Sequence, residues 1–415
     1  MRRTSALGAA VFFAACGAEG GIDLASASPF CQQVVPAVES FMAESQAAYP
    51  TPSDDRYGGT VVVGGLGEML GGMNAGAPSD VVALQNQQFV NLMTLLNYDA
   101  DAMPQPYLAD WDVSDDNTEI TFHIRQNVFW HEGEQTDAHD VAFTYRLLTD
   151  PAVGYANPAY WEHYEQGEDG LEIIDDFTIK IGMRPHADFL DVWRVVPILP
   201  EHLLGEVSPE TIAGHPYGSE CPAGNGPFVF SSHATQDRWV FNANPAFPEG
   251  LGGRPFLDRY VYRIIPDQTT LQTELLVQNV DVYISLLPSQ AQRIIDDPGV
   301  DLVDYQGRGY VFVAWNSRRP LPADSRVRRA LTLGTNRLEI VEAIQQGYGT
   351  IANSGVPPTH WAYDAELLAS LAYDPVEAGM LLEQAGWTDR DEDGVRENDP
   401  GEPLSISLSF NSGSQ

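Results

Sequence analysis

An alternating strand, a turn and a capped helix follow one another between residues 119 and 149, and this arrangement constrains the fold most. Apolar and polar residues alternate with period two in "EITFHIRQ", which indicates a strand with one buried face. The turn "HEGEQ" follows. "AHDVAFTYRLLTD" then predicts a helix with Thr136 or Asp137 as its N-cap. The chain therefore mixes strands and helices at short range.

The rest of the chain shows the same mixture without strict alternation of strand and helix. "GGTVVVGG", "TIKIGM" and "RYVYRIIP" read as strands, and "LSISLSF" near the end reads as another. Helices are predicted from Ser79 or Asp80 over 79–96, and over 324–347 and 374–386, the last two ending at glycines.

Three histidines in the opening stretch suggest a metal site. His123, His131 and His139 lie eight residues apart. A zinc hydrolase of this kind needs H-E-x-x-H on one helix face. In "HEGEQ", the position of the second histidine is occupied by Gln135. The predicted elements place the three histidines on a strand, in a turn and at a helix start. The pattern favours structural roles, and a secreted metal-dependent hydrolase using them is a minor alternative.

A glycine-rich segment after the first strand invites a dinucleotide-binding interpretation. Gly65, Gly67 and Gly71 in "GGLGEMLGG" give a spacing one residue too long, and no helical period follows directly. The glycines indicate a flexible or tightly turned segment instead.

An acidic turn over 389–399 begins like a calcium loop. Asp389, Asp391 and Asp393 occupy the first three ligand positions, but the twelfth position is Pro400 rather than glutamate. We find no nucleophile motif for hydrolysis either. The sequence therefore predicts no metal, no cofactor and no enzyme activity.

Composition excludes some partners. The chain has 415 residues and a formal net charge of −36, a length suited to two or three domains. Nucleic acid binds through Lys and Arg, so nucleic acid and anionic membrane surfaces are poor partners for this chain.

The first sixteen residues predict export. "MRR" precedes a short apolar stretch that ends in small residues at Cys16. This resembles a bacterial lipoprotein signal over 1–16, with lipid on Cys16; an ordinary secretory peptide is the alternative. No later stretch of 18 apolar residues follows, so the lipid would be the only membrane attachment.

The chain holds three cysteines. If Cys16 carries lipid, Cys31 and Cys221 remain, and outside the cytoplasm two such thiols can persist as a disulfide, so we predict this bond. Two separate thiols are the alternative.

Several phrases carry a family resemblance. "LADWDVSDDNTEITFHIRQNVFWHEGEQTDAHDVAFTYRLLTDP" resembles the signature region of bacterial extracellular solute-binding proteins of family 5, the peptide receptors of ABC importers. "VPILPEHLL", "GNGPFVF", "VAWNSRRPLPADSRVRRALTLGTNR" and "DPVEAGMLLEQAGWTDRDEDGVRE" continue the resemblance in the family's order, from Tyr57 to the last residue.

The resemblance implies an α/β, two-lobed, periplasmic-binding-protein-like fold of type II with an extra subdomain. Its expected parts are a tether at 17–56, lobe one at 57–74 and 197–306, the inserted subdomain at 75–196, and lobe two at 307–415. Family members continue further, which implies a truncated chain with an incomplete second lobe.

The resemblance also implies a function. We expect a monomeric receptor that captures peptides between its lobes and delivers them to an ABC permease, at the periplasm or the outer face of the cell membrane. A receptor for a nickel chelate, an oligosaccharide or an opine is the alternative within this fold. The expected ligand-binding residues lie in three segments: Glu68, Met69 and Leu70; Tyr160 and Trp161; Tyr310, Trp315 and Asn316.

Overall fold

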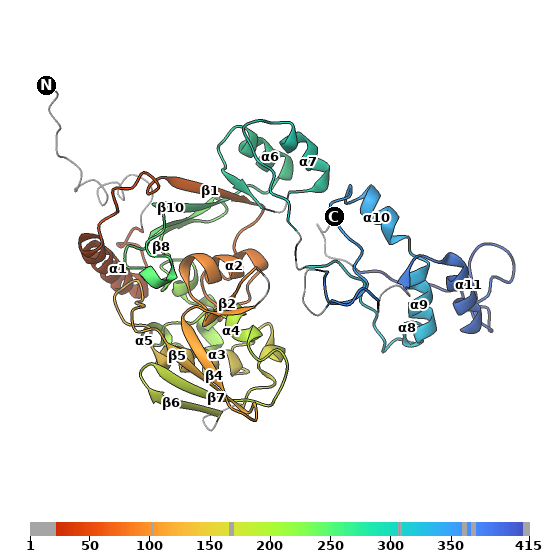
Figure 1. Cartoon of the computed structure of the whole chain (residues 1–415), viewed down its shortest axis with the longest axis horizontal. Coiled ribbons are helices and arrows are strands. Elements are labelled where there is room, and N and C mark those ends of the chain that lie inside the picture. The colour runs from red at the N-terminus through yellow and green to blue at the C-terminus, as the bar shows by residue number, and fades with distance from the viewer. Residues whose placement is uncertain are drawn as a thin grey trace. The chain divides into compact units, whose positions relative to one another are not determined.

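The chain folds as two units, residues 1–285 and 286–415 (Figure 1). This division lies before residue 307, where the resemblance placed the start of lobe two. The computed structural model describes residues 22–100, 103–165, 170–284, 286–305, 307, 309–358, 363–366 and 371–409. Cys16, the expected lipidation site, lies outside the described residues.

A five-stranded sheet forms one layer of unit 1, in the order β11-β1-β10-β9-β8. β1 runs parallel to both of its neighbours, whereas β10, β9 and β8 are antiparallel to one another. Helix α6 (Gln268–Leu276) connects β10 to β11, so the chain crosses over β1 between them. The strands are β1 (Thr60–Gly65), β8 (Phe228–Ala234), β9 (Arg238–Ala243), β10 (Arg259–Ile264) and β11 (Val282–Tyr283).

A smaller antiparallel sheet, in the order β4-β5-β7-β6, forms the other end of unit 1 (Figure 1). Helix α3 (Ala138–Thr149) packs on β6 and β7. A two-stranded ribbon of β2 (Leu96–Tyr98) and β3 (Pro104–Pro106) lies in the same unit. The four strands are β4 (Ala109–Val113), β5 (Glu119–Ile124), β6 (Leu171–Asp175) and β7 (Thr178–Gly182).

The predicted strand, turn and helix are confirmed. Ile120 and Phe122 of β5 are fully buried, while His123 between Phe122 and Ile124 is exposed. Asp137 caps α3 and accepts a hydrogen bond from His139 N at 2.8 Å. Because the alternation and the cap are both local signals, the sequence alone was sufficient to locate this module.

A helix near the N-terminus is fastened to unit 1. α1 (Pro29–Ala48) carries Cys31, which forms a disulfide with Cys221, 190 residues away. The ring of Phe30 packs edge-on against His215, with 4.6 Å between centroids. Much of the segment expected to be a tether is therefore a helix bonded covalently to the folded body.

Two predicted helices are too long. The helix expected over 79–96 is α2 (Val81–Asn86) followed by a π-helical turn, η1 (Gln87–Asn91). The helix expected over 324–347 breaks after residue 333 into α9 (Ser325–Leu333) and α10 (Arg337–Ala343), because Asn336 begins a new helix as its N-cap.

The remaining helices of unit 1 are short. None of the helices within the described ranges combines the length and the apolar character needed to cross a membrane. Over the described residues, the short helices of unit 1 are α4 (Asp191–Val195), α5 (Glu201–Leu204), η2 (Pro158–Trp161), η4 (Pro209–Gly214), η5 (Pro216–Gly218) and η6 (Glu249–Leu251).

Over the described residues of unit 2, the named elements are helices, joined by long segments without helix or strand. α9 packs on α11 (Pro375–Gln384) through Ala330, Leu333 and Ala378. The other helices that the structure describes in unit 2 are α7 (Pro288–Ile295), α8 (Pro320–Ala323) and α10. The strand predicted at 404–410 is not formed over its described residues 404–409, where Leu408 is 68% exposed.

Candidate ligand-binding site

The carboxyl edge of the parallel strands is the natural ligand position in unit 1. β10 leads through α6 to β11, and these strands lie on opposite sides of β1. In open α/β sheets, ligands bind beyond the carboxyl ends of such parallel strands. The loop that leaves β1 at this edge, residues 66–72, contains the expected site residues Glu68, Met69 and Leu70.

Glycines let β1 pack closely where it reaches this edge. A Cβ atom on Gly64 would lie 2.3 Å from Leu271 Cδ1, and one on Gly65 would lie 1.9 Å from the Tyr262 hydroxyl. Gly71 and Gly72 have φ values of +80° and +57°, which few other residues adopt. The glycine-rich segment therefore serves close packing and tight turning, as predicted.

Glu68 joins the loop to two strands. Its Oε1 accepts a hydrogen bond from Trp239 Nε1 on β9, and its Oε2 accepts one from Gln236 N at 2.9 Å. His233 on β8 places Nε2 3.3 Å from the same Oε2. The Glu68 carboxylate is thus occupied by the protein itself, and it positions the loop.

These contacts keep Glu68 ionised. Burial alone raises the pKa of the Glu68 carboxyl, but the hydrogen bonds from the Gln236 amide, the Trp239 indole and His233 outweigh burial and hold the pKa below its usual value of 4.5. A charged carboxylate with several donors is a stable anchor for a loop.

The next two residues have opposite environments. Met69 is 2% exposed and belongs to the core under the sheet, whereas Leu70 is 59% exposed. Of the three expected residues in this loop, Leu70 is the one whose side chain is available to a ligand.

The second expected group, Tyr160 and Trp161, lies on η2 near the smaller sheet rather than in the loop after β1. Trp161 is 2% exposed and packs edge-on against Tyr145 and Trp193, with centroids 5.4 Å and 5.3 Å apart. Tyr160 is 41% exposed. Trp161 is therefore part of the core beneath the smaller sheet, and only Tyr160 presents its ring to solvent.

The third expected group lies in unit 2. Tyr310 is 42% exposed. Trp315 is half-buried and lines a cavity of about 440 Å³ with Arg328, Thr332 and other residues. Asn316 uses its side-chain oxygen locally, accepting a hydrogen bond from Arg318 N at 3.1 Å. Within unit 1, Glu68, Met69 and Leu70 share the loop after β1, whereas Tyr160 and Trp161 lie on a 3-10 helix, η2 (Pro158–Trp161).

Sequence reasoning missed the partners of Glu68. His233 and Trp239 are 165 and 171 residues from Glu68. No spacing rule connects positions this distant. A stack of the His233 ring on the Trp239 indole, with centroids 3.8 Å apart, completes the support of the loop.

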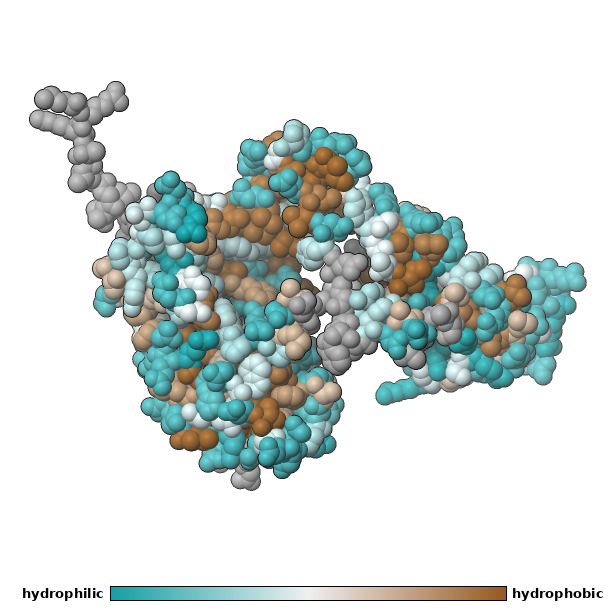
Figure 2. Space-filling view, in the orientation of Figure 1, coloured by the Kyte–Doolittle hydropathy of each residue, from teal (hydrophilic) through white to brown (hydrophobic). Residues whose placement is uncertain are grey.

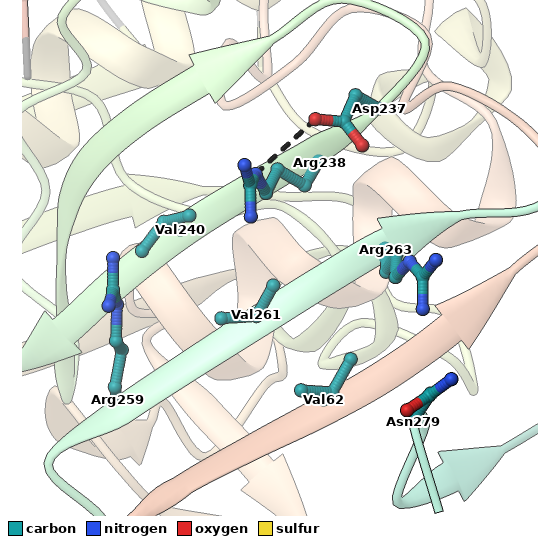
Figure 3. Close-up of a pocket in the computed structure, with 8 residues that line it drawn as sticks. All are labelled: Val62, Asp237, Arg238, Val240, Arg259, Val261, Arg263 and Asn279. Carbon is teal, nitrogen blue, oxygen red and sulfur yellow. Dashed lines mark ion pairs between the residues drawn. The ribbon is translucent and has the colours of Figure 1, made fainter. Parts of the chain in front are cut away.

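A separate cavity of about 380 Å³ lies over the middle of the five-stranded sheet. Val62, Val261 and Val240 are paired across three strands and share this face (Figure 3). Figure 2 shows apolar surface over β1 and β10. Arg238 and Arg263 border the cavity, and their guanidinium groups pair with Asp237 at 3.3 Å and with Glu274 at 2.7 Å.

The three histidines of the metal hypothesis have separate roles. His123 Nε2 lies 3.1 Å from Asp112 Oδ2 at the surface, and His139 is exposed at the start of α3. His131 is fully buried: Gly224 N donates to its Nδ1 at 3.0 Å, so Nε2 carries the proton and donates to Gly226 O at 3.1 Å. Burial lowers the pKa of His131 to about 4. Its role is structural.

The acidic turn brings carboxylates together. Within the described residues, Asp389, Asp391 and Glu397 have ligand atoms within 4.8 Å of one another, and none of the three histidines joins such a group. Asp389 accepts a hydrogen bond from Gly394 N at 3.0 Å. The carboxylates thus hold the turn through its own backbone.

Comparison with known proteins adds the family. Residues 103–415 match the family model described as "Bacterial extracellular solute-binding proteins, family 5 Middle". The chain belongs to this family. The predicted membership is thereby confirmed, and the family is one of solute receptors.

The chain is similar to two named members at sequence level. It is 29% identical over 306 residues to heme-binding protein A of Haemophilus influenzae, covering 68% of this chain and 54% of that protein. It is 27% identical over 297 residues to the oligopeptide-binding protein AppA of Bacillus subtilis, covering 70% and 53%. The chain therefore spans about half the length of these relatives.

Solved structures show the same fold. AppA in complex with a nonapeptide superposes with a TM-score of 0.71 at 24% identity, covering 84% of this chain and 68% of that one. NikZ of Campylobacter jejuni in complex with Ni(L-His) gives 0.68 at 23% identity, covering 83% and 66%. The predicted α/β fold of the periplasmic-binding-protein type is confirmed.

Proposed function

We propose that the protein is the solute receptor of an ABC importer and that its ligands are peptides. The observation that carries this proposal is the family match over residues 103–415. The relatives include a protein named for oligopeptide binding. The receptor captures its ligand and does not transform it, so no catalytic residues are assigned.

The loop after β1 supplies the unit 1 part of the proposed site. Extended peptides are held by hydrogen bonds to backbone groups, and pockets accept alternate side chains. Glu68 fixes the backbone of this loop through Trp239 and Gln236. Residues 66–70 can then offer a rigid edge to a peptide, while Tyr160, Tyr310, Trp315 and Asn316 remain proposed contacts.

Delivery to a permease requires an exported receptor. We propose lipid attachment at Cys16, with the folded monomer held at the outer face of a membrane. The disulfide between Cys31 and Cys221 suits an oxidising compartment outside the cytoplasm. Closure of a binding protein around its ligand is the change that an importer reads.

A thermal-shift screen of the whole protein tests the peptide assignment. A ligand that binds only the folded state raises the melting temperature by mass action. Di-, tri- and longer peptides should raise it in a concentration-dependent manner. A rise with heme or nickel–histidine and none with any peptide would favour the alternative receptor, for which the heme-binding relative and the Ni(L-His) complex are the motivation.

A further inference from the structure

A turn over residues 215–221 lies against the loop after β1. Its centre is the short helix η5, and it closes on itself through a hydrogen bond from Glu220 N to Pro216 O at 2.9 Å. Met73, which directly follows the loop, donates from its backbone N to Gly218 O at 2.7 Å. A backbone hydrogen bond therefore joins this turn to the end of the loop.

The backbones of the turn and the loop pack closely. A Cβ atom on Gly72 would lie 2.1 Å from Gly218 O. One on Gly218 would lie 3.2 Å from both Gly71 O and Asn74 Cβ. The fully buried Asn74 side chain donates to Ile212 O, shortly before the turn, at 2.7 Å. Because such close packing leaves no free space, a shift of the turn would also shift the loop.

His233 forms a second connection between the turn and the loop. Its Nδ1 lies 3.3 Å from Ser219 O in the turn, and its Nε2 lies 3.3 Å from Glu68 Oε2 in the loop. The imidazole is held in this position by its stack on the Trp239 indole. Glu68, which anchors the loop to the sheet, is therefore linked to the turn through a single side chain.

The disulfide fixes the last residue of the turn. Cys221 bonds to Cys31 of α1, and both cysteines are buried. Phe30, the neighbour of Cys31, packs on His215 at the start of the turn. The turn is short and Ser219 within it is exposed, and segments of this kind open more readily than core strands. The disulfide restricts this opening because it attaches the turn to a helix of 20 residues.

We propose that the disulfide between Cys31 and Cys221 positions the loop after β1 for ligand binding, by holding the 215–221 turn against that loop. The inference rests on the proposed function, in which this loop is the unit 1 part of the binding site. A loop that is held in one conformation before binding loses less conformational entropy when the ligand binds, so the affinity is higher. The disulfide therefore contributes to ligand affinity as well as to stability.

Residue-resolved amide hydrogen exchange of the whole protein tests the hold on the loop without any ligand. The double variant combines Cys31→Ser with Cys221→Ser and is studied well below its melting temperature. Exchange at Met73 N should become about tenfold faster relative to the amides of β5, because the turn that holds Met73 opens locally. A general loss of stability would instead raise both exchange rates by the same factor.

Calorimetric titration with trialanine measures the consequence for binding. The double variant should bind this tripeptide about tenfold more weakly than the unmodified protein. Phe41→Ala is the matched control, because Phe41 attaches α1 elsewhere, with its ring centroid 6.1 Å from that of Phe129. It leaves the disulfide intact and should change neither the exchange at Met73 N nor the affinity.

Gly218→Ala tests the same contact with the disulfide in place. Its methyl group would lie 3.2 Å from Gly71 O and from Asn74 Cβ, so it should push the turn away from the loop. Met73 N should again exchange faster relative to the amides of β5. This variant decides the proposal if the double variant does not fold, and an unchanged exchange ratio would contradict the hold of the turn on the loop.

The outcomes separate the role of the disulfide from the proposed function. A lower melting temperature of the double variant, with an unchanged exchange ratio and unchanged affinity, would show that the bond only stabilises the fold and overturn the proposal. Faster exchange at Met73 N with unchanged affinity would overturn the link to ligand binding. Absence of tripeptide binding by the unmodified protein would contradict the proposed function, while faster exchange at Met73 N would still support the hold of the disulfide on the loop.

Discussion

The imidazole of His233 stacks on the indole of Trp239, with ring centroids 3.8 Å apart and planes at 21°. Both side chains reach Glu68: the indole Nε1 donates to Oε1, and His233 Nε2 lies 3.3 Å from Oε2. His233 and Trp239 thus both contact the carboxylate of Glu68, although they are far from it in the sequence. These contacts hold the loop after β1 in position.

Removing this carboxylate should destabilise unit 1. Glu68→Ala leaves the Trp239 indole and the Gln236 amide without their acceptor, at a cost of about 1–3 kcal/mol in the free energy of unfolding. Glu68→Gln keeps one acceptor oxygen and should cost less. Urea unfolding measures both, with the exposed Glu39→Ala on α1 as control. Equal stability of Glu68→Ala and Glu39→Ala would mean that the carboxylate does not anchor the loop.

Close packing of β1 predicts a contrast between two glycines in one segment. Gly65→Ala places a methyl group 1.9 Å from the Tyr262 hydroxyl, whereas Gly67→Ala meets no atom within 4 Å. Overpacking in a core costs about 1–3 kcal/mol. Thermal unfolding should show a lower melting temperature for Gly65→Ala and little change for Gly67→Ala. The reverse order would refute the packing described at this edge.

The sequence predicted local features well and distant ones poorly. The β5 strand and the cap of α3 were predictable because period-two burial and an Asp N-cap are encoded within a few residues. The helix expected over 79–96 changes at Gln87 to a π-helical turn, and the Gln87 side chain donates to Gly72 O, a contact outside the helix. The partners of Glu68 have no local signal, because they lie 165 and 171 residues away in the sequence.

The predicted site residues show the same contrast between local signals and contacts with distant parts of the sequence. Residues 68–70 follow β1, as the strand prediction placed them; Met69 is buried in the core and Glu68 supports the loop. Trp161 lies in an aromatic cluster whose members Tyr145 and Trp193 come from distant segments. Sequence position alone does not distinguish a buried aromatic residue from an exposed one.

His131 predicts a loss of stability in acid. Its pKa is lowered from 6.5 to about 4 in the folded protein by burial. The unfolded chain therefore takes up a proton first, so the contribution is present above pH 6.5 and is lost as the pH falls toward about 4. A shift of this size corresponds to about 3 kcal/mol.

To test this, the free energy of unfolding is measured at several pH values between 6.5 and about 4. His131→Gln should show a shallower decline than the unmodified protein, whatever its stability at neutral pH. The exposed His139→Gln serves as control and should follow the unmodified curve. A decline in His131→Gln as steep as in the unmodified protein would contradict the assignment of a neutral, buried His131.

The disulfide between Cys31 and Cys221 should stabilise the fold, because it attaches α1 covalently to the rest of unit 1. Replacing Cys31 and Cys221 by serine should lower the free energy of unfolding by about 2–5 kcal/mol. It should also expose α1 to limited proteolysis near residue 48, since only non-covalent contacts, among them those of Phe30 and Phe41, would then hold the helix. Reducing agent should reproduce the effect in the unmodified protein and add nothing in the double variant. An equal stability of both proteins would exclude this role for the bond.

The proposed receptor function depends on which solute the protein binds, and equilibrium titration of the whole protein with defined ligands determines that solute. Separate calorimetric titrations would use tripeptides, heme, nickel–histidine and an oligosaccharide. We expect saturable binding of tripeptides at one site per chain and no comparable binding of the other three ligands. Saturable binding of heme, nickel–histidine or the oligosaccharide, with no heat from any peptide, would contradict it.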